Sequence, residues 1–271
     1  MARKINNARD QVSSILGASP EEIIFTSCGS ESDNTALMSA LNIEKEKMHI
    51  ITSRVEHPAV KALCSHLSKK GYRITEIPVD REGRFDMDKY SESLTPDTAI
   101  VSLMWANNET GVIFPVEEAA QMAKDRGIIF HTDAVQAVGK IPINLKNSSI
   151  DMLSLSGHKL HAPKGIGVLY VRKGTKFSPF LIGGHQERGR RGGTENTAGI
   201  IGLGKACELA ANNVNVEKTR VKDLRDKLEK GILSVIPKSR VNGGEADRLP
   251  NTSNISFEFV EGEAILLLMD E

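Results

Sequence analysis

The chain has 271 residues, and its 35 Lys and Arg balance 35 Asp and Glu, so no polyanionic partner such as a nucleic acid is indicated. Its first residues, MARKINNARD, lack the apolar stretch of a signal peptide, and the apolar run 264–269 is too short to cross a bilayer. Three cysteines, Cys28, Cys64 and Cys207, have no metal-ligand spacing, and an odd number does not suit a disulfide framework. Composition therefore favours a cytoplasmic globular protein without a membrane segment.

The first half of the chain alternates predicted helices and strands. Apolar residues recur at helical spacing within 3–16. Further helices are expected at 34–46, 59–69, 87–94 and 116–125, and strands at 22–26, 49–52, 72–79 and 99–105. Alternation of this length predicts an α/β fold with a mostly parallel central sheet flanked by helices.

Two later apolar runs each end in residues suited to chemistry. One ends at Asp133, and the other, 151–155, runs into Ser156-Gly-His-Lys159. In open α/β sheets, ligands bind at the carboxyl ends of the strands. A lysine and an aspartate in one cavity suit pyridoxal phosphate (PLP), because the amine forms a Schiff base with the aldehyde and the carboxylate keeps the pyridine nitrogen protonated. Taken singly, Lys159 is as readily a surface lysine and Asp133 a helix cap.

A third candidate segment follows the strand expected at 22–26. Gly29 lets backbone amides approach a ligand, and Ser30 with Asp33 fits the start of the helix at 34–46. Exposed amides at a helix N-terminus bind phosphate. Without further information, this pattern is only a capping box.

The segments HTDAVQAVGKIPI (131–143) and LSLSGHKLHAPKGIGVLY (153–170) resemble the PLP-dependent cysteine desulfurases of the NifS/IscS type, and most closely their nitrogen-fixation branch. The resemblance runs through essentially the whole chain and implies the aspartate-aminotransferase fold, PLP fold type I, in a homodimer. It also implies conversion of L-cysteine to L-alanine, with the sulfur left as a cysteine persulfide for an iron–sulfur scaffold protein. A selenocysteine lyase and another fold-type-I PLP enzyme are the alternatives.

The resemblance also implies residue roles. Lys159 would carry the Schiff base, and His57, in VEHPAV, would stack on the PLP ring and assist proton transfer. Asp133 and Gln136 would contact the ring nitrogen and the phenolic oxygen. The other implied cofactor-binding residues are Gly29, Ser30, Asn108, Ser156, His158 and Thr194. Thr194 lies in the Arg- and Gly-rich loop 183–196 and would bind the PLP phosphate of the partner subunit. Without the resemblance, His57 is an ordinary loop histidine and Asn108 a turn residue.

Two domains are expected. Residues 1–212 would form the large PLP-binding domain, and 213–271 a connecting helix and the beginning of a small C-terminal domain. Within them we expect helices at 197–211, 214–235 and 261–269, and strands at 166–171 and 253–259.

The family's N-terminal segment and its C-terminal loop with the sulfur-accepting cysteine have no counterpart in the sequence, which predicts a chain truncated at both ends. None of the three cysteines matches that nucleophile. We therefore expect these 271 residues, assayed alone, to be an inactive fragment that binds PLP and dimerises.

Three rival interpretations remain open at this point. The segment 199–206, GIIGLGKA, nearly matches a nucleotide-binding P-loop, but Ala206 has no hydroxyl for Mg²⁺. The loop 183–196 resembles one short RGG-type RNA-binding segment, which is weak evidence in a neutral chain. A metal site could use His131, Asp133, His158 and His161. Such spacings are common by chance and PLP uses the same segments better, so no metal site is predicted.

Overall fold

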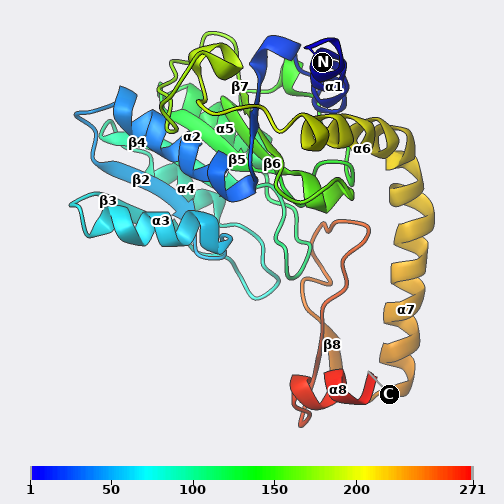
Figure 1. Cartoon of the computed structure of the whole chain (residues 1–271). Coiled ribbons are helices and arrows are strands. Elements are labelled where there is room, and N and C mark those ends of the chain that lie inside the picture. Colours follow the sequence, from blue (N-terminus) through cyan, green and yellow to red (C-terminus); the bar gives the residue numbers. More distant parts are fainter. Residues whose placement is uncertain (1, 270–271) are drawn as a thin grey trace.

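The computed structural model describes residues 2–269 and places a seven-stranded sheet at the centre of the molecule (Figure 1). The strand order is β1-β7-β6-β5-β4-β2-β3, and only β7 is antiparallel to its neighbours. The strands are β1 (Ile23–Thr26), β2 (His49–Ser53), β3 (Arg73–Ile77), β4 (Thr98–Met104), β5 (Ile129–Asp133), β6 (Met152–Ser156) and β7 (Gly167–Val171). The predicted α/β fold with a mostly parallel sheet is confirmed.

Helices cover both faces of this sheet, which explains why β4 is a nearly continuous apolar run with every residue buried. One face packs on α2 (Gly29–Ile43) and α3 (Pro58–Ser68). The other packs on α1 (Ala2–Leu16), α4 (Met87–Ser93), α5 (Val116–Lys124) and α6 (Thr197–Val216). Because side chains alternate along a strand, each strand contributes to both cores.

Helix α2 begins at Gly29, and not near residue 34 as predicted. Its N-cap is Cys28, which makes no side-chain capping bond, so the capping box expected at Ser30 and Asp33 is wrong. The helix starts early because Gly29 packs directly on the sheet: a Cβ there would lie 3.3 Å from the Cβ of Ser156. As a result, Ser30 and Asp33 both lie in the first turns of α2, above the ends of β5 and β6.

The helices predicted separately at 197–211 and 214–235 form one continuous rod, because a π-helical turn (Glu217–Val221) joins α6 to α7 (Lys222–Val235). Asn213 does not break the helix, since its side chain donates to the Leu209 carbonyl at 2.7 Å. The predicted domain division at 212/213 falls inside this rod and remains a prediction.

The last elements lie beside the lower end of α7 in Figure 1: β8 (Ser239–Val241), β9 (Ile255–Phe257) and α8 (Gly262–Met269). The strand predicted at 253–259 and the helix predicted at 261–269 are thus confirmed. Among residues 2–269, no helix has both the length and the apolar composition needed to span a bilayer.

Candidate active site

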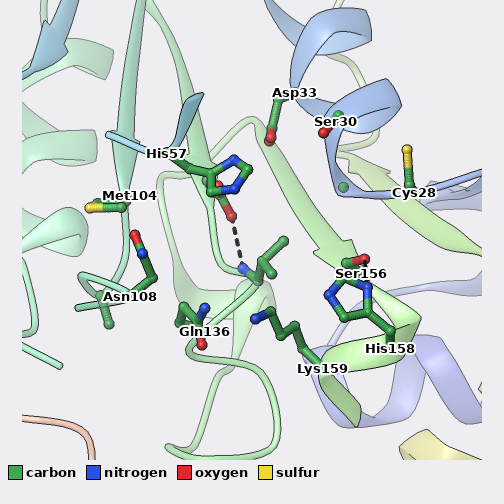
Figure 2. A pocket seen from close by; sticks show the side chains of 14 residues that line it. Cys28, Ser30, Asp33, His57, Met104, Asn108, Gln136, Ser156, His158 and Lys159 are labelled. Atoms are coloured by element: carbon green, nitrogen blue, oxygen red, sulfur yellow. Dashed lines mark hydrogen bonds between the residues drawn. The ribbon is translucent and has the colours of Figure 1, made fainter. Parts of the chain in front are cut away.

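A cavity of about 250 Å³ opens at the carboxyl edge of the sheet, between the ends of β5 and β6 and the start of α2 (Figure 2). Nine of the ten predicted cofactor-binding residues line this cavity: Gly29, Ser30, His57, Asn108, Asp133, Gln136, Ser156, His158 and Lys159. They come from segments up to 130 positions apart, counting from Gly29 to Lys159 (159 − 29). The topology of the sheet alone brings them together, because parallel strands end at one edge.

Lys159 lies on a single 3-10 turn, Gly157–Leu160, that follows β6 directly. His161 ends this turn in the left-handed region, with φ 61°. Gly157 packs so tightly that a Cβ there would lie 2.7 Å from Ile166. Figure 2 shows the Lys159 amine pointing into the cavity toward Gln136. Among the described residues it makes no hydrogen bond or ion pair, so the amine is available to a ligand.

Asp133 is the last residue of β5, and its side chain forms the cavity floor with only 6% of the residue exposed. One carboxyl oxygen accepts a hydrogen bond from the Val135 amide at 2.9 Å. Burial raises the pKa of this carboxyl, and the hydrogen bond from the Val135 amide acts in the opposite direction. A desolvated carboxylate of this kind needs a cationic partner.

His57 is the N-cap of α3, and its Nδ1 accepts a hydrogen bond from the Ala59 amide at 3.2 Å. Nδ1 therefore carries no proton in this arrangement, and the tautomer with the proton on Nε2 is favoured. Pro58 supplies the first helical turn, where its missing amide hydrogen costs nothing. The imidazole lines the cavity (Figure 2).

The opposite end of the cavity suits an anion. The amides of Gly29 and Ser30, at the start of α2, have no intrahelical partners, and both residues line the cavity. Ser156 Oγ and His158 Nδ1 lie 3.0 Å apart at the same end. Partial burial lowers the pKa of His158, and the charges of Lys159 and Lys164 add to this effect. Neutral hydrogen-bonding groups and a helix N-terminus together suit a phosphate.

The cavity therefore matches PLP part by part. Its lysine suits the aldehyde, its buried carboxyl suits a protonated pyridine nitrogen, and its helix N-terminus suits the phosphate. Asp33 Oδ1, at the edge of this cavity, has no hydrogen-bond partner in the described chain.

Thr194 is the one predicted cofactor-binding residue that lies outside the cavity. It is exposed and lines a separate hollow with Ser27 and Arg191. Glu187 anchors this loop, since its carboxylate accepts two bonds from Arg9 at 2.8 Å and one from the Phe25 amide. The role of Thr194 toward a partner subunit stays a prediction.

Sequence reasoning missed two buried acids. Asp33 is not the capping residue that its position predicts: it is 1% exposed and lines the cavity. Glu56 is 4% exposed; its Oε1 accepts from Ser53 Oγ at 2.6 Å and from the Met104 amide at 2.9 Å. The position of Glu56, three residues after the buried strand β2 and next to His57, was the one pattern that could have indicated it.

The structure also bears on the rival interpretations. Residues 199–206, the near match to a P-loop, lie within α6 and follow no strand. Asn107, and not Asn108, forms the turn after β4, since its Oδ1 accepts from the amides of Glu109 and Thr110. Within residues 2–269, no group of three or more His, Cys, Asp or Glu side chains is arranged to hold a metal ion.

Comparison with known proteins agrees with this geometry. The aminotransferase class-V family matches residues 1–271. The cysteine desulfurase NifS of Azotobacter vinelandii is 60% identical over 268 residues, which cover 98% of this chain and 67% of that protein. Cysteine desulfurase 2 of Trichormus variabilis is 57% identical over 271 residues, covering 100% of this chain and 68% of its own length.

Solved structures show the same likeness. A NifS-like protein superposes with a TM-score of 0.94 at 38% identity, over 99% of this chain and 74% of that one. DndA from Streptomyces lividans superposes with a TM-score of 0.91 at 37% identity, over 99% and 77% of the two chains. SspA, solved in complex with cysteine, superposes with a TM-score of 0.86 at 35% identity, over 100% and 76%.

These likenesses cover the residues of the cavity as well as the sheet that carries it. The predicted family and fold are thereby confirmed. The chain belongs to the NifS-type cysteine desulfurases of the aminotransferase class-V family, whose members are PLP-dependent enzymes.

Proposed function

We propose that this chain binds PLP in the cavity at the carboxyl edge of the sheet, as the cofactor-binding part of an enzyme that takes sulfur from L-cysteine. One observation carries the proposal: Lys159 and Asp133, at the tips of neighbouring strands, line one cavity with the N-terminus of α2. PLP, when bound, supplies an aldehyde that captures the substrate amine and a protonated ring that accepts electrons from the substrate.

Each cavity residue then has a task. Lys159 Nζ would hold the aldehyde and would move a proton at the substrate. Asp133 would hold the proton on the ring nitrogen, because its buried carboxylate has no other cation in contact. His57 would shield the ring from water, with its own proton on Nε2. Gln136 orients the ring through its phenolic oxygen, and Asn108 contacts the cofactor and the substrate.

The phosphate is held by the amides of Gly29 and Ser30, the Ser156 hydroxyl and His158. Thr194 serves the cofactor of a second subunit, which is consistent with its exposed position away from its own cavity. A homodimer is therefore part of the proposal, as is an iron–sulfur scaffold protein that receives the sulfur.

L-cysteine is the proposed substrate because the curated relatives are named cysteine desulfurases and SspA was solved in complex with cysteine. Selenocysteine is the second candidate substrate, since it differs from cysteine only in the leaving atom.

Borohydride reduction tests the lysine assignment directly. The protein loaded with PLP should be yellow, and reduction should fix one cofactor per chain on Lys159, as found by peptide mapping. The matched control is Lys164→Ala, five residues further on and outside the cavity. It should give the same adduct, whereas Lys159→Ala should give none. An adduct on Lys164, or none on folded wild-type protein, would refute the proposal.

A further inference from the structure

Three buried carboxyl groups gather under the cavity and lack a resident counter-charge. Asp33, Glu56 and Asp133 are 1%, 4% and 6% exposed. Asp33 Oδ1 and Glu56 Oε2 have no hydrogen-bond partner among residues 2–269. A single protonated pyridine nitrogen brings one positive charge, which balances one of the three groups and not the other two.

The nearest basic side chain does not supply the missing charge. His131 Nε2 lies 3.7 Å from Asp33 Oδ1, but the imidazole is fully buried between two serine hydroxyls. Ser102 Oγ and Ser154 Oγ lie 2.9 Å from its two nitrogens. Burial lowers the pKa of His131 to about 3, so the ring is neutral at physiological pH.

The other titratable groups around the floor come from each element packed against it. Helix α2 contributes Cys28, the start of α3 contributes His57, and the turn after β6 contributes His158 and Lys159. Lys159 is occupied by the cofactor in the proposed function, and both histidines lie at the exposed rim. No lysine or arginine in the described chain pairs with any of the three buried acids.

We infer that Asp33 and Glu56 are positioning residues that work as neutral acids: they stay protonated behind Asp133 and leave it as the one anion on the cavity floor. The inference rests on the proposed function, since it assigns the single anion to a cofactor nitrogen.

Charge and burial both favour this state. The pKa of Glu56 is raised to about 8, chiefly by burial and with a smaller contribution from the charge of Asp133, against hydrogen bonds from Ser53 and Met104. Burial likewise raises the pKa of Asp33 well above its usual range, and the charge of Asp133 adds to the shift. Both shifts favour the protonated, neutral form of the acid. A second carboxylate beside Asp133 would be repelled in a medium of low dielectric constant.

Infrared spectroscopy of the cofactor-free protein at pH 7 tests the protonation states without any catalysis. Wild-type protein should show the carbonyl stretching band of protonated carboxyls, and Asp33→Asn and Glu56→Gln should each remove part of it. Asp88→Asn, at an exposed aspartate on α4, is the matched control and should remove none. If neither Asp33→Asn nor Glu56→Gln weakens this band, the inference is overturned.

Cofactor retention tests the positioning role. The Asp33→Asn variant should hold PLP about tenfold more tightly than the Asp33→Ala variant, because the amide keeps the polar contacts of a neutral acid. An equal loss of PLP retention in Asp33→Asn and Asp33→Ala would show that Asp33 acts as an anion, and it would overturn the inference. Circular dichroism checks that each variant is folded. Failure of wild-type protein to bind PLP would instead refute the proposed function, and the infrared result would still decide the protonation states.

Discussion

The sheet with its cavity and the C-terminal arm (residues 222–269) are held together in different ways. Helix α2, which forms one wall of the cavity, buries nine of its 15 residues. In the arm, α7 buries only Glu229, and α8 buries none of its eight residues. The leucines of α8 are 72–73% exposed. The cavity thus rests on apolar burial that helices α7 and α8 do not have.

Polar contacts hold the arm instead. Arg248 donates two hydrogen bonds to the Glu229 carboxylate, at 2.8 and 2.9 Å. The Leu249 amide donates to the Gly111 carbonyl at 2.8 Å, and the Ile113 amide donates to Asp247. Such contacts orient a segment without adding much stability, because each replaces hydrogen bonds to water. The comparison teaches that the cavity is preorganised by the core, while the arm is only oriented against it.

The largest effect is expected from removing the carboxylate on the cavity floor. Asp133→Ala leaves the ring nitrogen without its anion, which costs about 3–5 kcal/mol when one side of a buried ion pair is lost. PLP retention, followed by its visible absorption during dialysis, should fall by more than about a hundredfold. Asp133→Asn should behave similarly, since it keeps the shape and removes the charge. An unchanged affinity and spectrum would show that Asp133 is only structural.

A pair of leucine substitutions sharpens the contrast between core and arm. Leu37 in α2 is fully buried, so Leu37→Ala should lower the free energy of unfolding by about 2–5 kcal/mol. Leu266 in α8 is 72% exposed, so Leu266→Ala should change it by less than about 0.5 kcal/mol. Urea titration followed by circular dichroism measures both. Similar losses in the two variants would contradict the comparison.

The buried acids should make stability depend on pH. The pKa of Glu56 rises from 4.5 to about 8 on folding, so the folded state holds a proton that the unfolded state releases between these values. Wild-type stability should therefore fall as the pH rises through this window. Glu56→Gln removes this pH dependence. Its free energy of unfolding should exceed that of wild type by up to a few kcal/mol at pH 8, but not at pH 4. Thermal melts across this range measure the difference, and a constant gap between the two proteins would exclude the shift.

The smallest expected signal is sulfide release by these 271 residues assayed alone. Burial raises the pKa of both Cys64 and Cys207 to about 12, so neither supplies a thiolate at neutral pH. Cys28 lines the cavity, but as the N-cap of α2 it lies at the phosphate end, away from Lys159. We expect no sulfide and no persulfide from L-cysteine above a control with PLP only. Sulfide production that Cys28→Ala abolishes would contradict this prediction.

Most of the fold was predictable because its cues are local. The apolar runs at 99–105 and 151–155 are buried on both faces, and such runs indicate strands of a parallel sheet. The start of α2 was not predictable in this way. It depends on the close contact of Gly29 with Ser156, which are 127 positions apart (156 − 29).

The residues of the site also divide into those that the sequence predicted and those that only the packing revealed. Lys159 and Asp133 were found because each ends an apolar run, and the resemblance to a known family supplied His57, Asn108 and Thr194. Asp33 and Glu56 were not predicted, because nothing in a polar sequence segment indicates that an acidic side chain within it is buried. Only the packing of α2 and α3 on the sheet removes them from water.

By itself, the sequence determined the α/β alternation, the strand tips that bear Lys159 and Asp133, and the family. It could do so because periodicity and motif spacing are properties of short segments. The tertiary structure decided which groups share one cavity, that Thr194 lies outside it and that three carboxyls lie together beneath it. The physical reason is that burial, and with it the protonation state of an acid, depends on neighbours that are distant in the chain.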